Sequence, residues 1–297
     1  MKKVYSASVT PLTDDGRIDK KSLGRLIEFD IAGGIDGFFF LGTTGEWFAL
    51  STDMKRELIG SAVESAKGRA AILAGVNGAG FKSIIENIHS LSEFDLSAYV
   101  FQYPGGWAAP TDPVAFAHAV ADEADKPIYL YHIPGANNIH LHKEQFEAIL
   151  QHPNIKGLKN SSDSLRTRKE LLVLRDRIDF ELFEGQEWVV DESLLLGCDG
   201  ALVGLASLDA KILKGIAQAV DSGDVAEARK KQGLLLSLFD GIYGPDLATI
   251  WSGQKYALTL LGVLDSWKTL VPVNASLSAD QKDRIERCVS TYRSYLE

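Results

Sequence analysis

The sequence predicts an α/β fold, a (β/α)8 TIM barrel with an additional C-terminal helical bundle. Its 297 residues suit one such barrel with an appendage. Eight short runs of β-branched, aromatic and small apolar residues recur along the chain, and stretches with helical periodicity separate most of them. Strands that alternate with helices pair in parallel, because parallel neighbours need a crossover connection. Eight such units without a long structureless loop favour a closed barrel.

The expected strands are the apolar runs that lie between turn residues. An open doubly wound sheet is the main rival, but a nucleotide-binding version would carry a glycine fingerprint after the first strand. The segment from Ser8 to Asp19 has none. We expect strands at Val4–Leu12, Ile35–Leu41, Ala70–Val76, Ser97–Gln102, Pro127–Pro134, Ile155–Asn160, Phe180–Gly185 and Gly200–Ala206.

The expected helices carry apolar residues at i, i+3 and i+4 spacing. Within the barrel we expect them at Ser22–Gly33, Thr52–Lys67, Lys82–Glu93, Asp112–Ala124, His142–Gln151, Ser164–Asp176 and Glu187–Leu196. After the eighth strand the chain stays helical, at Lys211–Val220, Val225–Phe239, Gln254–Leu261 and Ala279–Leu296. We therefore predict a barrel over residues 1–224 and a helical region over residues 225–297 that packs on it.

The composition excludes several classes of protein. The chain is 45% apolar and 24% charged, as is usual for a globular domain. A net charge of −9 argues against nucleic acid as a partner. No charge-free apolar run reaches the length of about 18 residues that predicts a membrane span. With only two cysteines and no signal-peptide pattern at the N-terminus, we expect a cytoplasmic protein.

The first candidate site follows the second strand, where active sites of such barrels lie. Thr43 and Thr44 stand between Gly42 and Gly45, just before a helix. Two hydroxyls and the free backbone N–H groups beside them are suited to hold a carboxylate or a phosphate. The alternative is a flexible turn in which Ser51 caps the next helix.

Lys159 lies near the C-terminal end of the sixth strand. Strand alternation places Gly157 and Lys159 on one face, toward the barrel mouth, and Lys156 on the other. Burial lowers the pKa of a lysine amine and makes it nucleophilic, as a Schiff-base lysine requires. The alternative is a structural lysine that pairs with Asp163 or Glu184.

Two further strand ends carry groups suited to proton transfer or to substrate binding. Tyr129 and Tyr131 share a face of the fifth strand, and Tyr131, nearer the active end, is placed to relay protons. A core tyrosine bonded to the backbone is the alternative. After the seventh strand, Gln186 or Glu187 is placed to contact polar substrate groups, although an acid is also favourable at a helix N-terminus.

Together these motifs resemble the dihydrodipicolinate synthase/N-acetylneuraminate lyase superfamily. The resemblance rests on Gly-Thr-Thr-Gly-Glu after the second strand, Tyr-x-x-Pro at the fifth, Gly-x-Lys at the sixth and Gly-Cys-Asp-Gly-Ala at the eighth. An early Val-Thr-Pro-Leu and a late Gln-Lys-Tyr-Ala-Leu extend it over essentially the whole chain.

The resemblance implies a role for each matching residue. Lys159 would form an imine with pyruvate or another 2-oxo acid, and Thr43 and Thr44 would hold its carboxylate. Tyr131 would be the acid/base, with Thr44 as a bridge, and Gly185 and Leu202 would line the pocket. No metal and no organic cofactor are implied, and the family's oligomers predict a homo-oligomer, either a tetramer or a dimer.

The chain also departs from the family's patterns. Synthases usually follow the strand-five tyrosine with Asn-x-Pro-x-Arg, whereas here Ala136 stands at the arginine position. The paired tyrosines after the fourth strand are reduced to Tyr103, which we expect to contact the substrate. Sialic-acid lyases carry an acidic pair and a serine near the last two strands. Glu187 matches one acid, but Trp188 and Gly204 occupy the other two places.

We therefore expect a class I, Schiff-base lyase that acts on a 2-oxo acid and releases pyruvate or water, and we favour a 2-keto-3-deoxy sugar acid. Ala136 has no donor for a second carboxylate, and only the loop residues Arg166 and Arg168 remain to replace it. His140 and His142 lack an acid or a cysteine at useful spacing, so a metal-dependent aldolase is disfavoured. Two alternatives stay open: a 4-hydroxy-tetrahydrodipicolinate (dihydrodipicolinate) synthase, and a catalytically silent barrel that binds a 2-oxo acid.

Overall fold

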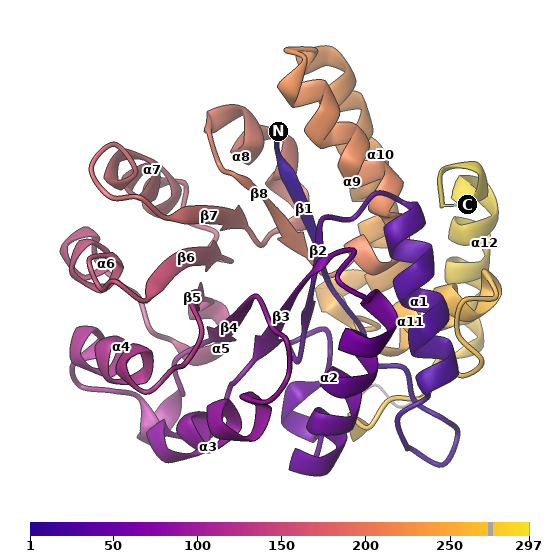
Figure 1. The fold of residues 1–297 in the computed structure, drawn as a ribbon. Helices are drawn as coiled ribbons and strands as arrows, with labels where there is room; N and C mark the ends of the chain where they lie inside the picture. Colours follow the sequence, from indigo (N-terminus) through magenta and orange to yellow (C-terminus); the bar gives the residue numbers. More distant parts are fainter. Residues whose placement is uncertain (273–275, 297) are drawn as a thin grey trace.

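The computed structural model describes residues 1–272 and 276–296. Eight parallel strands pair in chain order and close into a barrel where β8 meets β1, which confirms the predicted fold class. Figure 1 shows the strands at the centre with helices around them. The strands are β1 (Lys3–Ala7), β2 (Gly37–Phe40), β3 (Ala71–Gly75), β4 (Ala98–Phe101), β5 (Ile128–His132), β6 (Ile155–Asn160), β7 (Glu181–Glu184) and β8 (Gly200–Val203).

The helices follow the strands as the periodicity predicts. They are α1 (Lys20–Ala32), α2 (Thr52–Ala66), α3 (Phe81–Leu91), α4 (Pro113–Asp122), α5 (Pro134–Asn137), α6 (Lys143–Leu150), α7 (Leu165–Leu174), α8 (Val190–Leu196), α9 (Ala206–Asp221), α10 (Val225–Tyr243), α11 (Ser252–Leu260) and α12 (Ala279–Leu296). Short 3₁₀ turns add η1 (Trp47–Ala49), η2 (Gly106–Ala108), η3 (Glu187–Val189) and η4 (Pro245–Leu247).

Several predicted boundaries are wrong, mainly where a strand gives way to a loop. The expected first strand runs to Leu12, but β1 ends at Ala7. The expected fifth strand runs to Pro134, but this proline begins α5, because its fixed φ suits the first turn of a helix. The helix expected from Glu187 begins as η3, and α9 starts at Ala206 rather than at Lys211.

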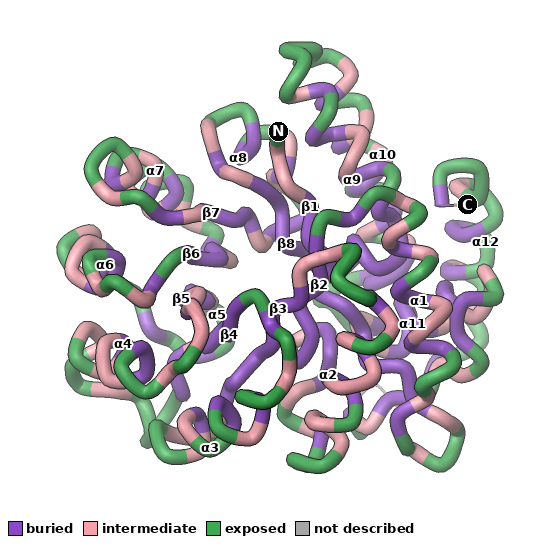
Figure 2. Tube along the Cα trace, in the orientation of Figure 1, coloured by how far each residue is buried: buried purple, intermediate pink, exposed green. Residues whose placement is uncertain are grey.

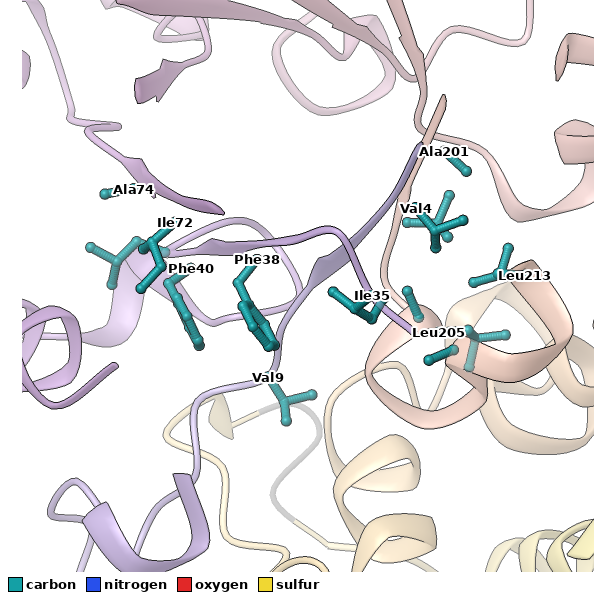
Figure 3. Close-up of a cluster of buried hydrophobic side chains, with 14 of the residues drawn as sticks. Val4, Val9, Ile35, Phe38, Phe40, Ile72, Ala74, Ala201, Leu205 and Leu213 are labelled. Carbon is teal, nitrogen blue, oxygen red and sulfur yellow. The ribbon is translucent and has the colours of Figure 1, made fainter. Parts of the chain in front are cut away.

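Two layers of apolar side chains form the core. Alternate residues of the strands point into the barrel, where Tyr5, Phe39, Tyr131, Phe183 and Leu202 belong to one buried cluster. The other strand face packs against the helices, and Figure 3 shows part of that layer around Val4, Phe38, Ile72 and Leu213. Along the chain, the strands in Figure 2 are accordingly buried, while the helices alternate between buried and exposed residues.

The last three helices, α10, α11 and α12, pack on the side of the barrel that is covered by α1 and α9, as Figure 1 shows. The helical region expected over residues 225–297 starts with α10 at Val225. Residues 273–275 and 297 of that region lie outside the described residues. The boundary at residue 224 stays a prediction. Within the described residues, no helix combines the length and the apolar character that a membrane span needs.

Candidate active site

A cleft of about 1030 Å³ opens at the C-terminal ends of the strands. Six residues predicted as site residues line it: Thr43, Thr44, Tyr131, Lys159, Gly185 and Glu187. They come from the ends of β2, β5, β6 and β7. Closure of the barrel brings these distant segments of the chain to one place, so the structure groups them as the strand-end argument expects.

Lys159 occupies the centre of this group. It lies in register with Tyr131 on β5, and only 4% of its surface is exposed. Its Nζ lies 4.2 Å from the centroid of the Tyr131 ring and 5.3 Å from that of Phe39. In the part of the chain that the structure describes, the amine has no hydrogen bond and no ion pair. Lys159 is thus a buried amine beside a phenol, at the wall of an open cleft.

The two acids that the sequence offers as structural partners for Lys159 bind elsewhere. Asp163 accepts a hydrogen bond from Nε2 of Gln186 at 2.9 Å. Glu184 forms a buried ion pair with Arg168, with Nε and Oε2 2.7 Å apart. The structural pairing that the sequence left open is therefore not formed.

The threonine turn is held by contacts from two sides. Leu41, at the end of β2, has a left-handed φ of 60°, which is uncommon for a leucine and turns the chain sharply before Thr43. Nε1 of Trp251 donates to the Thr43 carbonyl oxygen at 2.9 Å. Ser51 also caps α2, where its side chain accepts from the Met54 N–H at 3.3 Å. The cap leaves the hydroxyls of the turn at the cleft, so the two interpretations of this segment are compatible.

Glu187 is fixed in place although it follows a loop. Its Oε1 accepts from the N–H groups of Gly204 at 2.9 Å and Leu205 at 3.2 Å. Gln232 of α10 donates from Nε2 to the Glu187 carbonyl oxygen at 2.8 Å. Burial raises the pKa of the Glu187 carboxyl, while these backbone N–H groups and the charge of Lys159 act in the opposite direction.

Two predicted site residues do not reach the cleft. Leu202 is fully buried in the cluster inside the barrel, next to Tyr131 and Phe183, and therefore lies below the cleft floor. Tyr103 follows the end of β4, where strand alternation no longer determines the direction of a side chain. Its hydroxyl donates to the Pro113 carbonyl oxygen at 2.8 Å, and its ring packs against Phe116. Within one chain, Tyr103 is a core tyrosine.

Among the described residues, no lysine or arginine takes the place of the missing family arginine. Ala136 lines the cleft, as expected for that position. Arg168 is buried against Glu184, and Arg166 is exposed and pairs with Glu170 at 2.8 Å. Among the cleft residues that the structure describes, Lys159 is the only lysine or arginine.

One wall of the cleft carries residues that the motifs did not reveal. Phe239, Tyr243, Leu247 and Ile250, from α10 and the segment after it, line the cleft. No signal in the sequence pointed to them, because they follow the eighth strand and lie on no strand end.

Over residues 1–272 and 276–296, no group of three histidine, cysteine or acidic side chains is arranged to hold a metal ion.

Comparison with known proteins agrees with this geometry. The 4-hydroxy-tetrahydrodipicolinate synthase of Listeria innocua serovar 6a is 30% identical over 268 residues, which cover 88% of this chain and 89% of the relative. That of Aromatoleum aromaticum is 28% identical over 278 residues, with 93% of each chain covered. The solved structure of dihydrodipicolinate synthase from Bacteroides thetaiotaomicron superposes with a TM-score of 0.90 at 26% identity, covering 98% of each chain.

A family model, described as the dihydrodipicolinate synthetase family, matches residues 1–292. Its members are lyases that use a lysine Schiff base with pyruvate, so the chain is an enzyme and not a silent barrel. Motifs, fold and match over nearly the whole length agree, and the chain belongs to the dihydrodipicolinate synthetase family.

Proposed function

We propose that this enzyme cleaves a 2-keto-3-deoxy sugar acid into pyruvate and a hydroxylated aldehyde. The observation that carries the proposal is the charge of the cleft. A single unpaired lysine lines it, and the remaining polar lining consists of hydroxyls, amides, histidines and acids, with no second lysine or arginine among the described residues. Such a lining suits a substrate with one carboxylate and a neutral polyol tail.

In the proposed reaction, the amine of Lys159 adds to the C2 ketone, and the resulting carbinolamine hydroxyl takes a proton from solvent and leaves as water, which gives a protonated imine. The oxygen of Tyr131 takes the proton of the C4 hydroxyl as the phenol passes its own proton through Thr44 to solvent, and the C3–C4 bond breaks. Its electron pair moves into the imine to give an enamine, while C4 becomes the aldehyde. The enamine then takes a proton at C3, and water hydrolyses the imine to release pyruvate and the free lysine. Loss of the C4 hydroxyl as water would start from the same imine.

The other proposed roles follow from position. Thr43 and Thr44 hold the substrate carboxylate with hydroxyl and backbone donors at the end of β2. Glu187, close enough to Lys159 for their charges to interact, favours the positive charge of the imine. Gly185 leaves room for the lysine stem, since a Cβ there would lie 2.8 Å from Lys159 Cε.

The second candidate is the synthase activity named for the two relatives. That reaction joins pyruvate to aspartate semialdehyde, which carries a carboxylate of its own. Arginine would bind this group through two hydrogen bonds, and Ala136 cannot. Loss of a charge-assisted contact costs about 1.5–3 kcal/mol, roughly a 10- to 150-fold loss of efficiency. We therefore propose the lyase and expect poor condensation.

Borohydride reduction with pyruvate, followed by peptide mass spectrometry, tests the imine. We expect one adduct on Lys159 and none in Lys159→Ala, and an adduct elsewhere would refute the mechanism. Cleavage of a 2-keto-3-deoxy-hexonate and condensation with aspartate semialdehyde should then be measured side by side. Efficient condensation at physiological concentrations would overturn the sugar-acid assignment.

Tyr131→Phe separates proton transfer from imine formation. The variant should still form the pyruvate adduct, because Lys159 is untouched, but its kcat for cleavage should fall by about 10²- to 10⁴-fold. An unchanged kcat would remove Tyr131 from the proposed mechanism.

The homo-oligomeric state that we also propose, a tetramer or a dimer, is testable by light scattering.

A further inference from the structure

The cleft has two chemically different walls. One is polar and contains Ser161, Asp163, Thr167 and Gln186, from the segments that follow β6 and β7. The other is apolar and is formed by Trp188, two residues after Gln186 in η3, and by Phe239, Leu247 and Ile250, from α10 and the segment after it. A volume of about 1030 Å³ lies at the upper end of the range for ligand pockets, so a three-carbon acid at Lys159 fills only a small part of the cleft.

Trp188 is the best-defined element of the apolar wall. Its ring packs edge to face on Phe239, with centroids 5.5 Å apart, and Phe239 packs in the same way on Tyr243 at 5.1 Å. Gln232 ties the turn that carries Trp188 to α10, through the Glu187 carbonyl oxygen and the Asp191 N–H. Even so, 37% of the Trp188 surface remains exposed. A large apolar ring is thus held rigidly at the cleft and left partly uncovered.

A second hollow of about 540 Å³ continues past this ring. It shares Trp188, Phe239 and Leu247 with the cleft and adds Asp240 and Asp246. Its lining, in the described part of the chain, holds no lysine, arginine or histidine. A chain that leaves Lys159 and passes over Trp188 therefore meets carboxylates, which accept hydrogen bonds from hydroxyls and repel a second carboxylate.

We propose that Trp188 is a specificity-determining residue that selects substrates with a long hydroxylated tail. The C–H face of the tail packs against the indole ring, and its hydroxyls bind the hydrogen-bonded pair of Asp163 and Gln186, which also line the cleft. This inference rests on the proposed function, since the tail belongs to a 2-oxo acid held at Lys159. The substrate class is thereby narrowed to sugar acids whose tail extends beyond the first hydroxylated carbon.

The test compares two substrates that share the reacting carbons. One is a 2-keto-3-deoxy-hexonate, and the other is 4-hydroxy-2-oxopentanoate, whose tail is a single methyl group. Trp188→Ala should lower kcat/KM for the hexonate by about 10- to 100-fold and leave that for the short substrate unchanged. The loss should appear mainly in KM, because the ring is remote from the reacting atoms. Trp188→Phe should restore most of the preference.

Trp107→Ala is the matched control, because Trp107 is fully exposed and does not line the cleft. It should change neither substrate's kinetics. If both Trp188 variants keep the wild-type ratio of hexonate to pentanoate activity, the inference is overturned, and the pyruvate adduct on Lys159 still supports the proposed function. If no adduct forms in the wild-type enzyme, the proposed function fails and the inference fails with it. Should Trp188→Ala not fold, Trp188→Leu, which also removes the aromatic ring, replaces it, and an unchanged ratio in that variant overturns the inference.

Discussion

Gly185 makes room for the side chain of Lys159 because it has no side chain itself. A Cβ at this position would collide with Ser161 Oγ and would lie 2.8 Å from Lys159 Cε and 3.0 Å from the Asn160 carbonyl oxygen. Real Cβ atoms do not approach other heavy atoms so closely, and the packed strands leave little freedom to adjust. The glycine that the motif predicts as pocket lining therefore has a steric purpose, which is to let the lysine stem reach the cleft.

Gly185→Ala should consequently displace Lys159 and slow imine formation. A misplacement of about 1 Å can cost roughly 10²-fold in rate, and we expect a loss of that order. The measurement is the amount of reduced pyruvate adduct at fixed short times, by intact-protein mass spectrometry. Gly233→Ala is the control, because nothing lies within 4 Å of a Cβ at that exposed position in α10. Adduct formation at the wild-type rate in Gly185→Ala would contradict this steric role.

At the scale of elements, a buried ion pair joins the threonine turn to the C-terminal helices. Glu46 ends the Gly-Thr-Thr-Gly-Glu motif, and its carboxylate contacts Lys255 Nζ, with both side chains fully buried. The same carboxylate accepts from Thr269 Oγ1 at 2.6 Å and from the Leu270 N–H at 2.9 Å. The motif's acid is therefore a structural anchor that keeps Thr43 and Thr44 at the cleft.

Lys255→Met should lower the free energy of unfolding by about 3–5 kcal/mol, because it leaves the Glu46 charge buried without its partner. Urea titration followed by circular dichroism measures the change. The double variant Glu46→Gln with Lys255→Met should recover part of the loss. Arg17→Met, which breaks an exposed pair with Asp15, should cost less than about 1 kcal/mol. A Lys255→Met effect as small as that of Arg17→Met would show that the anchor is not needed.

A second buried acid, at the start of α9, makes stability depend on pH. Both carboxylate oxygens of Asp209 are buried without a hydrogen-bond partner among the described residues. Burial, with the nearby charges of Glu187 and Asp30, raises the pKa of Asp209 well above its usual value. A raised folded pKa gives a contribution that is present below the unfolded pKa of about 3.9 and is lost as pH rises through the folded value.

Thermal unfolding at pH 5 and pH 8 therefore should separate Asp209→Asn from the wild type. The amide cannot ionise, so the variant's melting temperature relative to wild type should rise between pH 5 and pH 8. Asp179→Asn, at an exposed position, serves as the control and should show no such change. An Asp209→Asn difference that is the same at both pH values would mean that this carboxyl does not titrate on unfolding.

Across the whole molecule, the C-terminal helices are joined to the barrel by hydrogen bonds and by a common apolar core. Gln254 of α11 donates to the Gly204 carbonyl oxygen at 2.7 Å, and Trp251 donates to that of Thr43 at 2.9 Å. Both acceptors belong to strand-end loops of the cleft. The helices beyond residue 224 therefore form part of the site and hold its loops in place.

We expect the full chain to unfold as one cooperative unit for this reason. Urea transitions followed by far-ultraviolet circular dichroism and by tryptophan fluorescence should coincide. Hydrogen exchange should report whether α10 to α12 open together with the barrel. An earlier, separate transition of residues 225–297 would contradict this expectation and would support two independent domains.

The amino-acid sequence was sufficient to predict the barrel, the order of its strands and the position of Lys159 near a strand end. Strand alternation is a local property, and eight alternating units leave few topologies, so periodicity suffices for these inferences. The same rule placed Tyr131 near the active end of its strand, and the motif placed Thr43 and Thr44 at the strand end.

Tertiary structure decided the features that depend on partners far away in the chain. It removed Leu202 and Tyr103 from the cleft, paired Arg168 with Glu184, and brought α10 with Trp188 over the barrel mouth. Leu202 lies within β8, where alternation points it into the barrel interior below the cleft. A side chain beyond a strand end, such as Tyr103, has no alternation to direct it. Its direction is set by the packing and hydrogen bonds it finds, and those form only once the chain has folded.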